Sequence, residues 1–336
     1  MAITITEIAE MTGVSKSAVH RALSGAPGVR ENIRQEVLEC ATRHHYQPNL
    51  SARVLVGART RLTALLATNF GNVNFAQFLR GAGEKAGASG YHLLTASDEK
   101  ELNPLKQLGL EGVIGFFRKL DAGVVGRLPA ISLLWGVPGD MSVKNCISSE
   151  VEYGAGLAIR HLLALGHRRI GFVTVSIPGD QDAVVKAAAY RRVLAEAGIE
   201  YDPSLVVGAE LYRERCGYEA ALKLLTMPEP PTAVFGLSDI LATGCYRAAR
   251  ELNLRIPEDL SVCGYDDKEY CSLLYPALTT VRPQYGELGS RAMDMLIHRI
   301  EGWEYQELEP LLPALVQRDS TGPVRTGNRK NRMCRK

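Results

Sequence analysis

Apolar and polar positions in the first 45 residues follow the spacing of short amphipathic helices. Residues 4–25 predict two helices joined at Gly13, where glycine permits a sharp turn. Thr6 and Ser15 are typical N-cap residues for these two helices. A third helix is predicted over residues 30–45, although Arg30 at its start cannot cap it with a side-chain oxygen. The residues expected to close a three-helix core are Ile8, Val14, Val19, Leu23, Ile33, Val37, Leu38 and Ala41.

A short linking segment follows at residues 46–60. Pro48 ends the third helix, and Asn49 is suited to cap a new helix over about 50–56, which Gly57 ends. A helix of this length is marginal in water by itself. We therefore expect this segment to fold only when it has a partner such as DNA.

From Leu62 onward, apolar strands alternate with helices. The clearest helices are predicted over residues 153–165, 182–197, 214–226 and 284–301, separated by apolar runs such as RIGFVTV and TAVFGLS. This alternation indicates parallel sheets covered by helices on both faces. Because one doubly wound sheet rarely needs so many units, two Rossmann-like lobes with a cleft between them fit better. Ligands in such lobes bind at the carboxyl ends of the strands.

Charge is concentrated at the two ends of the 336-residue chain. The whole chain carries +2, residues 1–60 carry +2 and residues 325–336 carry +6, so residues 61–324 carry −6. A basic tail can bind nucleic acid, but this one has too few apolar residues to pack. We therefore favour a solvated, disordered tail.

Several classes of protein are not indicated. The seven cysteines are scattered without metal-type spacing, which suggests buried, reduced thiols in a reducing cytoplasm. We find no signal peptide and no apolar run of the roughly 20 residues that span a membrane. No nucleophile–base or metal motif occurs, and GAGEKAG at residues 81–87 is better explained by close helix packing than by nucleotide binding. The sequence therefore predicts no enzyme activity, metal, cofactor or membrane partner.

The second helix carries the clearest functional signal. At helical spacing it would present Lys16, Ser17, His20 and Arg21 to the major groove of DNA, which is wide enough for one helix. Dimerisation is expected as well, because paired half-sites about one helical turn apart require two-fold symmetry.

The order of motifs along residues 3–320 resembles the LacI/GalR family of transcriptional regulators. The motifs are GVSKSAVHRAL, YQPNLSAR, HLLALGHRRIGFV, PTAVF, SVCGYDD, LTTVRP and QRDST. The resemblance implies an all-α helix-turn-helix head, a hinge helix, and an α/β two-lobed body like the periplasmic sugar-binding proteins. It also implies a homodimer that binds a palindromic operator in double-stranded DNA, with an affinity set by a small effector.

The resemblance assigns the DNA-binding residues position by position. Lys16, Ser17 and Arg21 match recognition-helix positions, and Arg21 is suited to a bidentate guanine contact or to phosphate. His20 replaces the usual serine, so a phosphate contact, an altered base preference or simple packing stays open. Leu55 matches the leucine that wedges into the minor groove. The full expected set is Ser15, Lys16, Ser17, His20, Arg21, Asn49, Ala52, Arg53 and Leu55.

The effector pocket departs from the family pattern. Asp266 matches the acidic residue that accepts hydrogen bonds from effector hydroxyls. Lys186 stands where an arginine clamp is usual and offers only a point charge, and Ser238 replaces an asparagine. The expected pocket residues are Asn72, Phe75, Lys186, Tyr212, Ser238, Asp266 and Tyr285. They predict a small polar, hydroxylated effector, such as a carbohydrate or derivative.

Four domains follow from these expectations. They are a helix-turn-helix domain at 1–46, a hinge helix and linker at 47–60, an effector-binding and dimerisation domain at 61–320, and a disordered basic tail at 321–336. The large domain is divided into an N-lobe (about 61–158 plus 290–320) and a C-lobe (about 159–289). A repressor is favoured; an activator, a corepressor-dependent regulator and a two-lobed ligand-binding protein that does not bind DNA remain alternatives.

Overall fold

The computed structural model describes residues 3–23, 25–46, 59–67, 74–135, 145–306 and 308–325. Two compact units are present, Met1–Thr60 with Gln107–Gly109, and Arg61–Lys106 with Leu110–Lys336. The helices α1 (Ile5–Thr12), α2 (Lys16–Leu23) and α3 (Glu31–Arg43) belong to the first unit. The strands and remaining helices of both lobes belong to the second. The helical head and the α/β body expected from the sequence are therefore both present.

The head is a three-helix cluster whose core matches most of the predicted apolar set. Ile8, Val19 and Val37 are fully buried. Leu38 was expected in this core but is exposed, because it lies one position away from the buried face that Val37 and Ala41 share. The first helix begins two residues earlier than predicted. Thr4, not Thr6, is its N-cap, and Thr4 forms a capping box with Glu7.

The third helix has no side-chain cap at Arg30, as the sequence predicted. A different arginine ties the head together. The guanidinium of Arg34 donates hydrogen bonds to the carbonyl oxygens of Arg21 (3.5 Å), Ala22 (3.2 Å) and Ala26 (2.7 Å). Two of these oxygens are in the last turn of α2, where helix carbonyls have no partner within the helix. A cation there also interacts favourably with the helix dipole.

Replacing Arg34 by alanine is expected to loosen α2. Hydrogen bonds from a charged donor contribute roughly 1.5–3 kcal/mol. Local opening should therefore speed amide hydrogen exchange in α2 by about 10- to 100-fold. Arg43→Ala, at the exposed end of α3, serves as the control and should leave α2 protected. Equal protection of α2 in both variants would show that the three contacts do not stabilise it.

The first lobe of the body is built on a five-stranded parallel sheet. Its strands are β1 (Leu62–Leu66), β2 (His92–Ala96), β3 (Leu110–Gly115), β4 (Ala130–Leu134) and β5 (Cys146–Ser148), in the order β2-β1-β3-β4-β5. Its helices are α5 (Phe75–Ala88), α6 (Leu102–Gln107), α7 (Ala122–Val125) and α12 (Tyr285–Glu301). β1 is completely buried, as expected for a central parallel strand with both faces covered.

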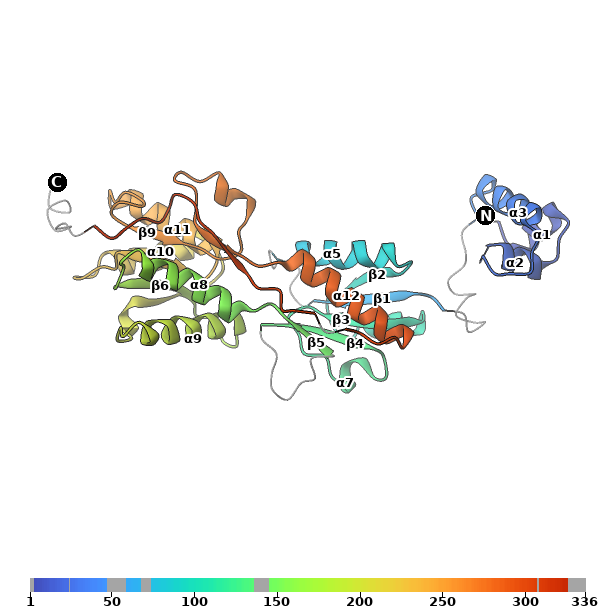
Figure 1. The fold of residues 1–336 in the computed structure, drawn as a ribbon, viewed down its shortest axis with the longest axis horizontal. Coiled ribbons are helices and arrows are strands. Elements are labelled where there is room, and N and C mark those ends of the chain that lie inside the picture. The colour runs from blue at the N-terminus through green and yellow to red at the C-terminus, as the bar shows by residue number, and fades with distance from the viewer. Residues whose placement is uncertain are drawn as a thin grey trace. The chain divides into compact units, whose positions relative to one another are not determined.

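Helices α5 and α12 lie side by side on this sheet (Figure 1). Glycines allow their backbones to approach: a Cβ on Gly81 would lie 1.9 Å from the carbonyl oxygen of Gly286, and one on Gly289 would lie 2.1 Å from that of Phe78. Gly81 is the first glycine of GAGEKAG. The motif therefore lies within a helix and serves close packing at Gly81, as the sequence predicted.

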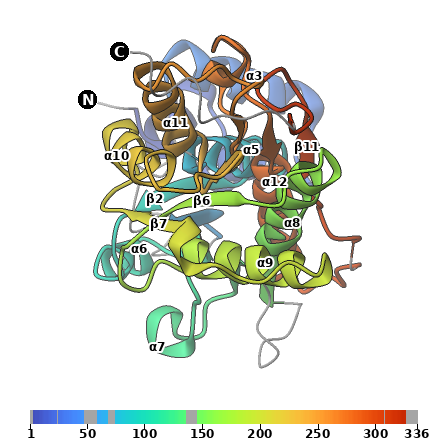
Figure 2. The same ribbon diagram turned by 90° about the vertical axis from the view of Figure 1, so that its left-hand side faces the viewer.

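The second lobe has a four-stranded parallel sheet in the order β7-β6-β8-β9. Its strands are β6 (Ile170–Val175), β7 (Val206–Ala209), β8 (Ala233–Gly236) and β9 (Ser261–Cys263). Helices α8 (Val151–Ala164) and α9 (Gln181–Glu196) cover one face, and α10 (Glu214–Leu225) and α11 (Asp239–Glu251) cover the other (Figure 2). Two short 3-10 helices, η2 (Pro203–Leu205) and η3 (Glu269–Ser272), complete this lobe.

Three segments join the lobes, and they correct the predicted lobe boundaries. All of α8, from Val151, packs in the core of the second lobe, whereas α12, from Tyr285, packs in the core of the first. The N-lobe therefore ends before α8 and resumes at α12. The buried faces of the two helices set these boundaries. The apolar residues at the start of α8 pack in the second lobe, and those at the start of α12 pack in the first lobe.

The third joining segment corrects the lobe predicted for the residues before 320 and the predicted start of the disordered tail. The antiparallel strands β10 (Thr280–Arg282) and β11 (Ala314–Val316) pair with each other, and the chain then returns to the second lobe. Ser320 is buried and accepts a hydrogen bond from the backbone N–H of Thr279. The backbone N–H of Val324 donates to the carbonyl oxygen of Leu165 at 2.9 Å. The chain thus stays attached to the C-lobe as far as Val324, which is incompatible with a disordered tail beginning at 321. Residues 326–336 lie outside the described residues.

Candidate functional site

Helix α2 has one buried and one solvent-facing side. Val19 and Ala22 are buried, whereas Lys16, Ser17, His20 and Arg21 are exposed. The helix begins at the predicted cap, where the Oγ of Ser15 accepts a hydrogen bond from the backbone N–H of Ala18 at 3.2 Å. Gly13, at φ +66°, closes α1 in the left-handed conformation. The predicted DNA-reading side chains in the head therefore share one exposed face.

In the body, the most unusual buried group is the ammonium of Lys186 on α9. Its Nζ donates to Asp182 Oδ2 (2.8 Å) and to the carbonyl oxygen of Leu237 (2.9 Å), and it lies 3.6 Å from the centre of the Tyr265 ring. The side chain is almost completely buried. Its positive charge is thus matched by a carboxylate one helical turn earlier, a carbonyl dipole and an aromatic face.

Asp266 joins the two lobes directly. This buried carboxylate, just after β9, accepts a hydrogen bond at 2.9 Å from the side-chain amide of Asn74, the N-cap residue of α5. The Nζ of Lys268 donates to the amide oxygen of the same Asn74 at 2.6 Å. Burial raises the pKa of Asp266, while Lys186, Lys268 and the Asn74 hydrogen bond oppose this rise. A second-lobe carboxylate therefore holds the start of a first-lobe helix.

Three tyrosines surround these charges. Burial raises the pKa of Tyr285, and the neighbouring groups Tyr265, Asp266 and Asp182 raise it further. Tyr212 is partly exposed, and its hydroxyl donates to Asp180 Oδ2 at 3.0 Å. We call the side chains of Asn74, Asp180, Asp182, Lys186, Tyr212, Tyr265, Asp266, Lys268 and Tyr285 the inter-lobe site.

The comparisons with known proteins agree with both parts of the chain. Residues 4–49 match the family model "Bacterial regulatory proteins, lacI family", and residues 159–321 match the model "Periplasmic binding protein-like domain". The ribose operon repressor of Haemophilus influenzae is 30% identical over 322 residues, covering 91% of this chain and 96% of the relative. The repressor PurR of Yersinia enterocolitica is 31% identical, covering 96% and 98%.

The chain belongs to the LacI family. It is therefore a DNA-binding transcriptional regulator with a helix-turn-helix head and an effector-binding body. Among solved structures, the Lac repressor bound to ONPG in the repressed state has a TM-score of 0.84 and 25% identity, covering 96% of this chain and 100% of that one. The complex of the regulator CelR with cellobiose has a TM-score of 0.67 and 25% identity, covering 95% and 99%. The named relatives are regulators of transcription and not enzymes.

Most effector residues predicted for this LacI-family chain gather in or beside the inter-lobe site. Lys186, Tyr212, Asp266 and Tyr285 belong to it, and Ser238 follows the carbonyl of Leu237 that Lys186 contacts. Phe75 does not. It is buried in the N-lobe core with its ring edge-on to Phe116 at 5.3 Å, because the first turn of α5 directs it toward the sheet. Asn72, like the hinge residues Asn49, Ala52, Arg53 and Leu55, lies outside the described residues.

Sequence reasoning missed Asn74, Asp182, Tyr265 and Lys268. A signal for Asp182 was present, since it lies four residues before Lys186, the spacing at which helical side chains meet. Asn74 had no such signal, because its partner Asp266 is 192 positions away.

Trp135 stacks on Phe117 with ring centres 4.2 Å apart, and Phe117 in turn meets Tyr285 edge-on. His167 contacts the hydroxyls of Thr232 and Ser261 and the carbonyl oxygen of Gly322. Within the described ranges, no group of three His, Cys, Asp or Glu side chains is placed to hold a metal ion, and no helix is long and apolar enough to cross a membrane.

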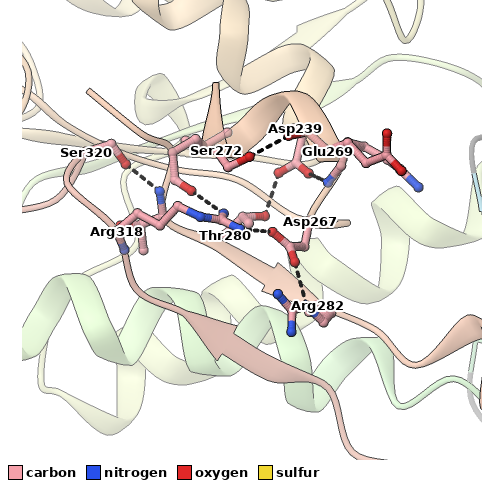
Figure 3. Close-up of polar contacts among 11 residues, drawn as sticks. Asp239, Asp267, Glu269, Ser272, Thr280, Arg282, Arg318 and Ser320 are labelled. Carbon is pink, nitrogen blue, oxygen red and sulfur yellow. Dashed lines mark hydrogen bonds and ion pairs between the residues drawn. The ribbon is translucent and has the colours of Figure 1, made fainter. Parts of the chain in front are cut away.

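The residue after Asp266 anchors two of the joining segments (Figure 3). Asp267 forms ion pairs with Arg282 Nε (2.5 Å), on β10, and with Arg318 NH2 (2.6 Å), shortly after β11. Asp266 and Asp267 have φ values of +116° and +52°, a region in which non-glycine residues are strained. The ion pairs and the backbone hydrogen bond from Asp266 N–H to the Val281 carbonyl (2.8 Å) hold this loop in place. Asp266 is thus fixed to the strands that connect the lobes.

Asp239, at the start of α11, is a buried carboxylate beside this network. It accepts hydrogen bonds from the Thr280 hydroxyl (2.5 Å) and from the Lys268 backbone N–H (2.9 Å) (Figure 3). Burial, reinforced by Asp266, raises its pKa to about 7. Between its ordinary value of 3.8 and about 7, the folded protein therefore holds a proton that the unfolded chain releases. Stability from this group is lost as pH rises through that window.

Asp239→Asn is expected to remove this pH dependence. The difference in melting temperature, variant minus wild type, should increase by at least about 2 °C as pH rises across the window. Asp202→Asn is the matched control: hydrogen bonds from Ser204 lower the pKa of Asp202, so this group titrates below the window and the melting-temperature difference of its variant should not increase across it. Parallel pH profiles for wild type and Asp239→Asn would show that Asp239 does not titrate in this window.

Proposed function

We propose that this LacI-family regulator is a repressor that binds a palindromic operator as a homodimer, and that a small, polar, sugar-like effector at the inter-lobe site changes its operator affinity. One observation carries the proposal. The same chain holds a helix that exposes the side chains predicted to read bases, and a body whose two lobes meet at a buried carboxylate, Asp266. The related ribose operon repressor and PurR, both named repressors, support the direction of control.

The inter-lobe contact suggests how the effector acts. A ligand hydroxyl that donates to Asp266 competes with the amide of Asn74, so binding changes the contact between the lobes. A coupling free energy of about 1–3 kcal/mol is typical of such linkage. We expect residues 47–60 to transmit the change, with Asn49, Ala52, Arg53 and Leu55 on a hinge helix and Leu55 in the minor groove.

Selection of genomic fragments by the purified full-length protein at controlled salt tests this proposal. We expect an enriched palindrome whose half-sites are spaced for a dimer. Adding an effector should then weaken binding. A palindrome bound only in the presence of added metabolites would instead indicate a corepressor-dependent regulator. Binding that is salt-sensitive and independent of sequence, with or without metabolites, would overturn the proposal.

A further inference from the structure

Carboxylates outnumber cationic groups at the inter-lobe site. The site holds three carboxyl groups, those of Asp180, Asp182 and Asp266, but only two ammonium groups, those of Lys186 and Lys268. The carboxylates influence one another: Asp180 and Asp266 both raise the pKa of Asp182, adding to the larger effect of its burial. When all three carboxyl groups are ionised, the site has an excess of negative charge in an environment that solvates charge poorly, and a bound cation would compensate that excess.

Both lysines are already engaged with protein groups. An ammonium has three N–H donors. Lys186 uses two of them on Asp182 and Leu237 and rests on the ring of Tyr265. Lys268 donates to Asn74. Lys186 therefore has most of its donors bound to protein groups and is poorly suited to bind an anionic ligand, although it occupies the position where the family usually has an effector-binding arginine.

The uncharged groups at the site suit a hydroxylated cation. Tyr212, Tyr265 and Tyr285 place aromatic rings among the carboxylates, and such rings attract positive charge. Two buried hydroxyls, the Tyr265 OH at the site and the Ser238 Oγ beside it, have no hydrogen-bond partner among the described residues. Buried hydroxyls without partners are costly, and a ligand with hydroxyl groups satisfies them.

We propose that the effector is a hydroxylated small molecule that carries a positively charged amine, such as an amino sugar, with its ammonium group held by the carboxylates of the inter-lobe site. This inference rests on the proposed function, because it assumes that the effector binds at this site. It narrows the ligand from any polar, sugar-like molecule to a cationic one. A neutral sugar also hydrogen-bonds to carboxylates, but it leaves the excess negative charge uncompensated.

Matched ligand pairs test the charge directly on the wild-type protein. The probes are glucosamine, galactosamine and mannosamine, each paired with its N-acetyl derivative and its parent neutral sugar. Thermal shift identifies the ligands that bind, and calorimetry measures their affinities. At least one amine should bind roughly tenfold more tightly than both of its neutral partners, because hydrogen bonds between charged groups are stronger than those to neutral groups.

The possible outcomes separate this inference from the proposed function. If only neutral members bind and alter operator affinity, the proposed function stands and the cationic effector is overturned. If amines and neutral partners bind equally, the cationic effector is also overturned. If no compound of either kind binds, the sugar-like effector of the proposed function fails, and the cationic effector fails with it.

Two variants locate the charge. Asp182→Asn should abolish the preference for the amine over its N-acetyl partner, whereas Asp182→Glu, which keeps the charge, should retain it. Asp202→Asn, the same change in the same lobe at a carboxylate paired with Arg169, should leave the preference unchanged. An undiminished preference in a folded Asp182→Asn protein would show that Asp182 does not hold the ammonium.

Discussion

Replacing Arg21 by alanine is expected to remove base preference at one position in each half-site of the operator. Arg21 lies on the exposed face of α2, and arginine is suited to a bidentate contact with guanine. Loss of such a contact costs about 1–3 kcal/mol, which corresponds to roughly 5- to 150-fold in affinity for each half-site. The measurement is operator titration with a set of single-base variants at fixed salt. In Arg21→Ala, the variants at one position should bind with equal affinity.

Two control variants separate base recognition from general attraction to DNA. Lys16→Ala should weaken binding to all sequences alike and lower the slope of log affinity against log salt by about 1, as expected for a phosphate contact. Arg43→Ala, an arginine in the same head but outside α2, should leave base preference unchanged. If Arg21→Ala retains the full preference of the wild type at every position, Arg21 is not a base-reading residue.

The elements that could be predicted from the sequence are those fixed by local chemistry. Gly13 marks a turn because it adopts a left-handed conformation, and Ser15 marks a helix start because its hydroxyl caps that helix. Helices α8, α9, α10 and α12 begin and end within a few residues of their predicted limits, because each is long and strongly periodic. The exposed face of α2 follows from the same spacing that buries Val19 and Ala22.

The lobe boundaries and the neighbours of each pocket residue depend on contacts distant in sequence. Periodicity indicates that Leu38 and Phe75 belong to helices, but not which tertiary surface meets them. Leu38 was wrongly placed in the core, and Phe75, predicted at the effector site, packs in the core of the N-lobe. The Asn74–Asp266 contact joins residues on different lobes. This contact depends on how the three joining segments position one lobe against the other, and no local sequence pattern predicts that arrangement.

The resemblance predicted an effector clamp at Lys186, whereas the structure shows an ammonium matched by groups of its own lobe. Asp182 and Leu237 occupy its donors, and Tyr265 lies against it. A lysine at this position therefore differs from the arginine usual in the family in two ways: its donor group has another shape, and that group is already bound to partners in its own lobe. It leaves Asp266, with its contact to the opposite lobe, as the charged group best placed to report ligand binding.

Asp266→Ala is accordingly expected to abolish the response to effector while operator binding without effector persists. A typical response of about 5- to 150-fold in operator affinity should fall to none. The ligand for this test is the compound that most changes wild-type operator affinity among the amine and neutral sugar pairs. Operator binding is measured with and without it, and Asp202→Ala, in the same lobe, is expected to respond like the wild type.

Asn74→Ala distinguishes the two roles of Asp266. This variant keeps the carboxylate but removes its partner on the first lobe. It should still bind the effector, yet show a smaller change in operator affinity, because ligand binding no longer displaces a contact between the lobes. A wild-type response in Asp266→Ala would place the effector elsewhere, and a wild-type response in Asn74→Ala would exclude this contact as the link between ligand and DNA. Asp266→Ala removes the carboxylate, whereas Asn74→Ala keeps it and removes only its partner. Together the two variants therefore separate binding of the effector from transmission of its signal.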